Sequence, residues 1–123
     1  MMVFKDILKN ALARTEGGIG AVIMGMDGIA VEKVLLDAGI EANLDVAAAE
    51  FNAIIRTAQR TGKTMEFGAL QEVVVSFDTL RFAMRQLSSD YYLVMALEAD
   101  GNLGRGRFEL RKAELDLARE FVL

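Results

Sequence analysis

The chain has 123 residues, a length typical of one domain, so we treat residues 1–123 as a single domain. It contains no cysteine and no histidine, which excludes disulfides, thiolate nucleophiles, histidine bases and the commonest zinc ligands. A net charge of -4 argues against non-specific binding to nucleic acid, which needs clustered lysine and arginine.

Charged residues interrupt the apolar N-terminal segment MMVFKDILKNALAR. We therefore expect no signal peptide, no membrane helix and a cytoplasmic location.

The first half of the chain begins with helical spacing of apolar residues over 2–15, which ends at Gly17-Gly18. Residues 19–26 are apolar on both faces and predict a central strand that is covered on both sides. Residues 29–36 predict a second strand. The Asp27-Gly28 pair between them predicts a hairpin with a type I′ turn, because that turn needs positive φ at both central residues.

Residues 44–60 predict a second helix, with Asn43 or Asp45 as its N-cap. Its inner stripe consists of Leu44, Ala47, Ala48, Phe51, Ile54, Ile55 and Ala58. Almost opposite lie the small apolar residues Val46, Ala49 and Ala53. These residues have two explanations that the sequence leaves open: another helix approaches closely, or alanine simply favours the helix on a solvent face.

The second half predicts three strands, at residues 70–77, 80–87 and 91–98, whose short connections require antiparallel neighbours. A helix over 102–121 follows. Its apolar stripe consists of Leu103, Gly106, Leu110, Ala113, Leu117 and Phe121. The order helix, strand, strand, helix, three strands, helix predicts an α+β fold. In this fold a five-stranded antiparallel sheet carries helices on both faces.

Two glycine-rich segments, residues 17–20 and 100–106, do not meet the requirements of a phosphate loop. The first precedes a strand, and the second has the spacing GxxGxG with no strand after its helix. We interpret them as tight turns and close helix–sheet contacts. Arg107 and Arg111 form one edge of the last helix and either contact an anionic partner or pair with Glu109, Glu114 or a neighbouring strand's carboxylate. We predict no catalytic residue, no metal ligand and no cofactor, and hence a protein that is not an enzyme.

Three segments together resemble the roadblock/dynein light chain family, and in particular its bacterial MglB-like branch. They are GAVIMGMDGIAVE (residues 20–32), AAAEFNAIIR (residues 47–56) and GNLGRGRFELRKA (residues 101–113). The resemblance implies a roadblock/profilin-like sheet of strand order 2-1-5-4-3. It also implies a homodimer that pairs its third strands and sets its second helices side by side. The expected dimer or partner interface is Val46, Ala49, Glu50, Ala53, Arg56, Arg60, Val73, Val74 and Val75.

The resemblance further implies binding to a small Ras-like GTPase of the MglA type and stimulation of its GTP hydrolysis. Such dimers reshape the GTPase's own active site and donate no arginine finger. The alternative is a structural scaffold or adaptor subunit of a larger complex, with no effect on GTP turnover. A small-molecule sensor is a third hypothesis, weakened because the apolar stripes carry no converging polar residues. We expect no nucleic-acid partner, no membrane insertion and no small-molecule substrate.

Overall fold

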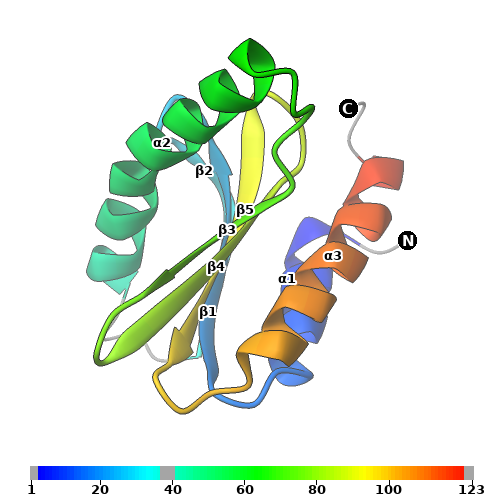
Figure 1. Ribbon diagram of the computed structural model, residues 1–123. Coiled ribbons are helices and arrows are strands. Elements are labelled where there is room, and N and C mark those ends of the chain that lie inside the picture. The colour runs from blue at the N-terminus through cyan, green and yellow to red at the C-terminus, as the bar shows by residue number, and fades with distance from the viewer. Residues whose placement is uncertain (1–2, 37–40, 121–123) are drawn as a thin grey trace.

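A computed structural model describes residues 3–36 and 41–120. The elements in chain order are α1 (Phe4–Ala13), β1 (Gly18–Gly25), β2 (Ala30–Leu35), α2 (Glu41–Thr64), β3 (Glu72–Ser76), β4 (Leu80–Gln86), β5 (Tyr91–Glu98) and α3 (Leu103–Glu120). The strands form one antiparallel sheet of order β2-β1-β5-β4-β3, which confirms the predicted fold class and topology. Helix α2 covers one face of the sheet, and α1 and α3 cover the other (Figure 1).

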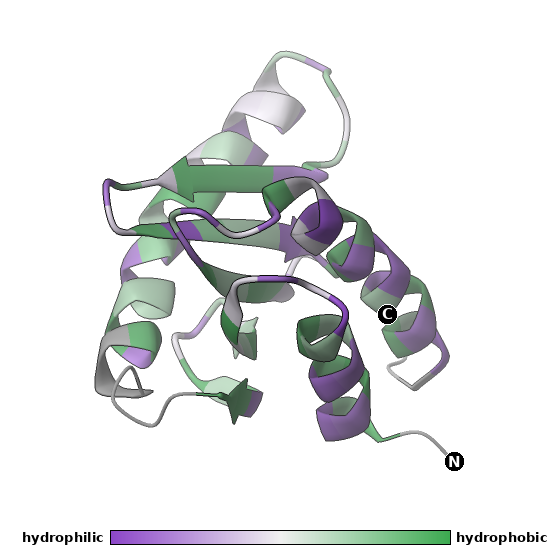
Figure 2. Ribbon diagram, turned by 90° about the horizontal axis from the view of Figure 1, so that it is seen from below, coloured by the Kyte–Doolittle hydropathy of each residue, from purple (hydrophilic) through white to green (hydrophobic). Residues whose placement is uncertain are grey.

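The two central strands supply both cores, because successive side chains of a strand point to opposite faces. In β1, Ala21 and Ile23 pack into the core under α1 and α3, whereas Val22 and Met24 pack into the core under α2. Figure 2 shows that the strands are mostly hydrophobic and that hydrophilic bands run along α1 and α3. The prediction that β1 is covered on both faces is confirmed.

The two glycine-rich segments meet in space and have structural roles. A Cβ on Gly17, which has φ +82, would lie 2.4 Å from the Gly101 Cα atom, so side chains at this point would separate the two loops. The Asn102 N–H donates to the Glu16 carbonyl at 2.8 Å across the same contact. Further along α3, a Cβ on Gly106 would lie 3.2 Å from Leu97, so glycine here allows α3 to approach β5 closely.

The hairpin between β1 and β2 differs from the predicted type I′ turn. Glu66 is the one non-glycine residue with positive φ among those that the structure describes, so Asp27 cannot occupy a type I′ position. Instead the Gly28 N–H donates to the Gly25 carbonyl at 2.9 Å, and Gly28 has φ +85. This is the arrangement of a type I turn followed by a left-handed glycine. The Asp27 carboxylate stabilises it by accepting the Ile29 N–H at 3.0 Å.

The start of α2 also differs from the prediction. The helix begins at Glu41, so Asn43 and Asp45 lie inside it and neither residue is the N-cap. Asp45 instead forms an ion pair with Lys33 of β2, with 2.8 Å between Oδ2 and Nζ. The polar residues that suggested a cap are therefore part of the first turns of a longer helix.

The inner stripe of α2 is narrower than predicted. Leu44, Ala48, Phe51 and Ile55 are buried, but Ile54 is 44% exposed. The physical reason is angular, because Ile54 lies roughly 90° from the centre of the four buried positions at about 100° per residue. In the last helix the predicted stripe is buried at Gly106, Leu110, Ala113 and Leu117 and half-buried at Leu103. Phe121, the final position of that stripe, lies outside the described residues.

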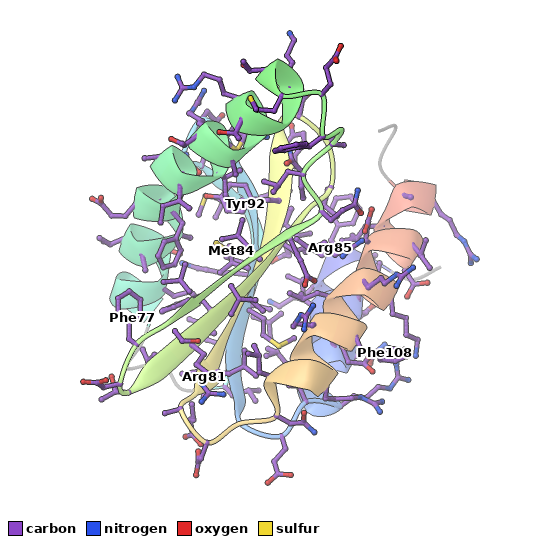
Figure 3. The ribbon with its side chains drawn as sticks, viewed as in Figure 1. Phe77, Arg81, Met84, Arg85, Tyr92 and Phe108 are labelled. Carbon is purple, nitrogen blue, oxygen red and sulfur yellow. The ribbon has the colours of Figure 1, made fainter. Side chains whose placement is uncertain are left out.

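Tyr92 connects the sheet to α2. Its side chain is buried, and its hydroxyl lies 2.5 Å from the Ala48 carbonyl oxygen and also contacts Asn52 Oδ1. Figure 3 shows the ring between the sheet and α2. Burial raises the pKa of Tyr92 from 10.0 to about 12, because the charged phenolate would lose its hydration.

We expect Tyr92 to make the fold unstable in alkali. Between pH 10 and about 12 the folded chain retains the phenol proton that the unfolded chain releases. The free energy of unfolding therefore falls as the pH rises, by up to roughly 1.4 kcal/mol per pH unit. Tyr92→Phe removes this contribution, at a cost of about 1 kcal/mol below pH 10 for the lost hydrogen bond. Urea unfolding of both proteins across this range tests the prediction, and parallel stability curves would contradict it.

Candidate protein interaction site

Strand β3 forms one edge of the sheet. Among the strands within residues 3–36 and 41–120, β3 pairs with β4 alone. The Phe77 N–H donates to the Leu80 carbonyl at 2.8 Å, which fixes the alternation of hydrogen bonds along β3. In that alternation Val73 and Val75 direct their backbone groups towards β4. The residues whose N–H and C=O groups point away from the sheet are Glu72, Val74 and Ser76.

The three valines of β3 are not equivalent. Val73 and Val75 pack against the core under α2. Val74 points to the opposite face of the sheet, where its side chain is 38% exposed. The strand therefore presents a free backbone edge with an apolar side chain at its centre. A bare apolar edge is a template for pairing with another strand.

The outer face of α2 carries small or apolar side chains. Val46, Ala49, Glu50 and Ala53 are exposed, and Ile54 is exposed beside them at the margin of the inner stripe. The apolar periodicity had placed Ile54 in the core. Its position at the margin of the apolar stripe was the signal that could have indicated exposure.

The two arginines predicted for this interface differ in their contacts. Arg60 is exposed near the C-terminal end of α2. Arg56 donates from Nη2 to the Met26 carbonyl at 2.8 Å, and Asn52 Nδ2 donates to the same oxygen at 3.1 Å. Arg56 and Asn52 therefore hold the β1–β2 hairpin against α2. This role of Asn52 was not predicted from the sequence, although an amide in the middle of a helix is itself a signal.

Arg107 and Arg111 also differ. Arg107 Nε donates to Glu72 Oε1 at 2.8 Å, which is the pairing with a neighbouring strand's carboxylate that the sequence offered as one explanation. On the same face of the sheet, Arg85 Nε donates to Glu114 Oε1 of α3 at 2.5 Å, and Figure 3 shows Arg85 between the sheet and α3. In the part of the chain that the structure describes, no ion pair involves Arg111. An anionic contact thus stays a prediction chiefly for Arg111.

No three acidic side chains among the described residues come together to hold a metal ion, and none of the described helices has the length and hydropathy to cross a bilayer. A groove of about 700 Å³ lies beside the C-terminal end of α2, lined in part by Lys63, Leu70, Leu87 and Glu114. The surfaces that stand out are the β3 edge and the outer face of α2, both suited to binding protein.

Comparison with known proteins agrees with this geometry. The chain is 33% identical to MglC from Myxococcus xanthus, with a TM-score of 0.74, over 98% of this chain and 100% of that chain. A Roadblock/LC7 domain from Streptomyces avermitilis has a TM-score of 0.80 at 16% identity, over 95% of this chain and 96% of that chain. The chain belongs to the roadblock/LC7 family. No family model and no curated protein matches the sequence.

The gliding protein MglB from Thermus thermophilus shares the fold, with a TM-score of 0.80 at 21% identity, over 93% of this chain and 84% of that chain. MglC and MglB are thus among the structural neighbours of this roadblock protein, as the resemblance to the MglB-like branch predicted. The family segments also contact one another. The hairpin of the first segment is held by Asn52 and Arg56 of the second, through the Met26 carbonyl. The third segment lies near the start of the first, because its Gly101 packs on Gly17, three positions before the first segment begins.

Proposed function

We propose that this roadblock protein is a homodimeric regulator that binds a small Ras-like GTPase of the MglA type. We further propose that it stimulates GTP hydrolysis without supplying a catalytic residue. The observation that carries the proposal is the open β3 edge on a sheet whose covering helix, α2, has a small-residue outer face. Membership in the roadblock family supports it, because the sequence resemblance implies this mode of pairing and this class of partner.

The dimer follows from the free backbone groups of β3. A two-fold axis beside Val74, perpendicular to the sheet, lets the Val74 N–H of each copy donate to the Val74 C=O of the other copy. Glu72 then lies opposite Ser76 of that copy, and both copies keep α2 on the same face of the joined sheet. The small side chains of Ala49 and Ala53 allow two α2 helices to approach to about 8–10 Å.

Stimulation without an arginine finger is consistent with where the arginines lie. A finger reaches the phosphates from an exposed position and contributes about 10³–10⁵ in rate. Here Arg56, Arg85 and Arg107 hold contacts within the fold, and the exposed Arg60 and Arg111 lie within helices and not on a loop. Arg105, at the start of α3, lies 2.9 Å from the Glu109 carboxylate. A regulator can act instead by binding the active arrangement of the GTPase's own switch loops more tightly than the inactive one.

A specific observation also supports the alternative, a scaffold or adaptor subunit without effect on GTP turnover. The chain is 33% identical to MglC but 21% identical to MglB of Thermus thermophilus. Stimulation of hydrolysis was the property implied by the likeness to MglB, and the lower sequence identity to MglB weakens the support for stimulation without bearing on binding.

Single-turnover GTP hydrolysis by a purified MglA-type GTPase tests the proposal. We expect saturating roadblock protein to raise the rate by about tenfold or more, which corresponds to at least about 1.4 kcal/mol of barrier. A parallel binding measurement separates the two functions. Binding with an unchanged rate would establish the scaffold instead, and absence of binding to either nucleotide state would reject both.

A further inference from the structure

The outer face of α3 carries two large apolar side chains that are mostly exposed. The helix packs on the sheet through Gly106, Leu110, Ala113 and Leu117. On the opposite side, Phe108 is 56% exposed and Leu115 is 64% exposed. Figure 3 shows Phe108 on the side of α3 that faces away from the sheet. The two residues are seven positions apart, which places them about 10.5 Å apart along one line of the helix.

Cations surround this pair, whereas the described acidic side chains of α3 are less exposed. Glu109 is 2% exposed, and Glu114 and Asp116 are half-buried. The exposed positions of the same face include Arg105, Arg111, Lys112 and Arg119. Within residues 3–36 and 41–120, no ion pair involves the last three of these cations. A chain of net charge -4 therefore carries a strip of positive charge along α3.

The Phe108 ring is held in its exposed position. The Arg105 guanidinium lies 5.3 Å from the ring centroid, a cation–π distance. The Arg105 guanidinium also forms an ion pair with the buried Glu109 carboxylate, 2.9 Å away, which lies 3.9 Å from Arg14 beside α1. A preorganised apolar anchor loses little conformational entropy when a partner covers it.

We propose that the outer face of α3 binds an acidic amphipathic helix of a partner protein. The apolar stripe of that helix covers Phe108 and Leu115, and its carboxylates pair with Arg111, Lys112 and Arg119. This site is separate from the β3 edge and the α2 face, and it stays exposed in the proposed dimer.

Two features specify a helix as the occupant. The backbone N–H and C=O groups in the middle of α3 are bonded within the helix, so this surface offers no partner to an extended peptide. A helix brings its own backbone bonds, and residues at i and i+7 on one of its faces match the spacing of Phe108 and Leu115. A lipid surface fits less well, because helices that lie in a membrane interface present a broad apolar face, whereas here charged residues separate two apolar side chains.

Fluorescence anisotropy with the full chain and two labelled helical peptides tests the proposal. The first peptide, of about 21 residues, has leucine along one face and glutamate elsewhere, and the second replaces every glutamate by lysine. We expect the acidic peptide to bind about tenfold or more tightly than its basic counterpart at low salt. Equal affinities, or no binding of the acidic peptide up to about 1 mM, would overturn the proposal.

Substitutions locate the binding to this face. Arg111→Glu and Leu115→Ala should each weaken binding of the acidic peptide by about tenfold or more. Lys63→Glu, an equal charge reversal at the end of α2, should leave it unchanged. Both α3 side chains are exposed, so the fold should persist, and thermal unfolding of each variant checks this. Equal effects of Lys63→Glu and Arg111→Glu would contradict the assignment.

Co-sedimentation with vesicles of phosphatidylcholine and phosphatidylserine, in a ratio of about four to one, separates a lipid surface from a protein partner. We expect no sedimentation of the chain with these vesicles at the salt concentration used for the peptides. If the chain sediments with the vesicles, Arg111→Glu abolishes this, and the acidic peptide does not bind, then the ligand of the α3 face is a membrane and the proposal of a partner helix is wrong. The assays contain no GTPase, so their failure leaves the proposed function untouched.

Discussion

Val74→Pro is expected to convert the proposed dimer into a folded monomer. Proline has no backbone N–H, so in a two-fold arrangement both Val74 N–H···O bonds between the copies are lost. Each bond that leaves a buried group unpaired costs about 1–3 kcal/mol, and two of them weaken association by roughly 10²-fold or more. The measurement is sedimentation velocity at about 10 μM. At this concentration a dimer with a binding free energy of about 8 kcal/mol, or a Kd of about 1 μM, is already formed.

The protomer should tolerate this change, because the Val74 N–H points away from β4 and makes no bond within the sheet. Proline is accepted on an edge strand when the missing N–H faces solvent. Val74→Thr, which keeps the branched side chain and the N–H, is the matched control and should remain dimeric. A wild-type chain that sediments as a monomer, or a proline variant that stays dimeric with unchanged affinity, would refute the pairing.

If the protein stimulates GTP hydrolysis, Ala53→Glu is expected to abolish stimulation, whereas removal of any one arginine leaves most of it. Ala53 lies exposed on the small-residue face of α2, where a glutamate from each copy would place two like charges at the closest approach of the helices. We propose that no arginine touches the phosphates. An arginine finger raises the hydrolysis rate by a factor of roughly 10³–10⁵, so no single Arg→Ala substitution should lower the stimulated rate by such a factor.

The measurement is single-turnover GTP hydrolysis at saturating protein for each variant, with Ala53→Ser as the matched control that keeps a small side chain. Arg56 and Arg85 contribute to the fold, so their variants are compared only if thermal unfolding shows that they remain folded. One Arg→Ala variant that binds the GTPase normally but loses about a thousandfold in rate would show that a finger exists.

Local patterns predicted the elements of this fold correctly. The alternation Leu80, Phe82, Met84 against Arg81 and Arg85 gives β4, with Phe82 and Met84 in the core under α2 and Arg85 on the α3 side. The fully apolar run of β1 required a central position, which the sheet order confirms. These predictions succeeded because burial of one face imposes a period on the sequence, and that period differs between helix and strand.

The predictions that failed concern ends and margins. The Asp27-Gly28 pair correctly identified a hairpin. The type of turn depends on the number of residues in the loop, and the same pair also fits a type I turn that is followed by a left-handed glycine and a bulge. Asn43 and Asp45 have the chemistry of a cap, yet α2 begins before them. Ile54 belongs to the apolar stripe by type but lies at its margin, where the sheet no longer covers it.

The sequence by itself determined the class of this protein: a chain without cysteine or histidine, a sheet covered on both faces, and the segments of a roadblock protein. Only the tertiary structure decided which charged side chains already have a hydrogen-bond or ion-pair partner within the fold. Arg107 is bonded to Glu72, 35 positions away, and Arg56 to the Met26 carbonyl, 30 positions away, whereas Arg111 has no ion pair within residues 3–36 and 41–120. The reason is physical. Periodicity reports which side of an element is buried, but the partner of a surface charge depends on which distant element the fold brings beside it.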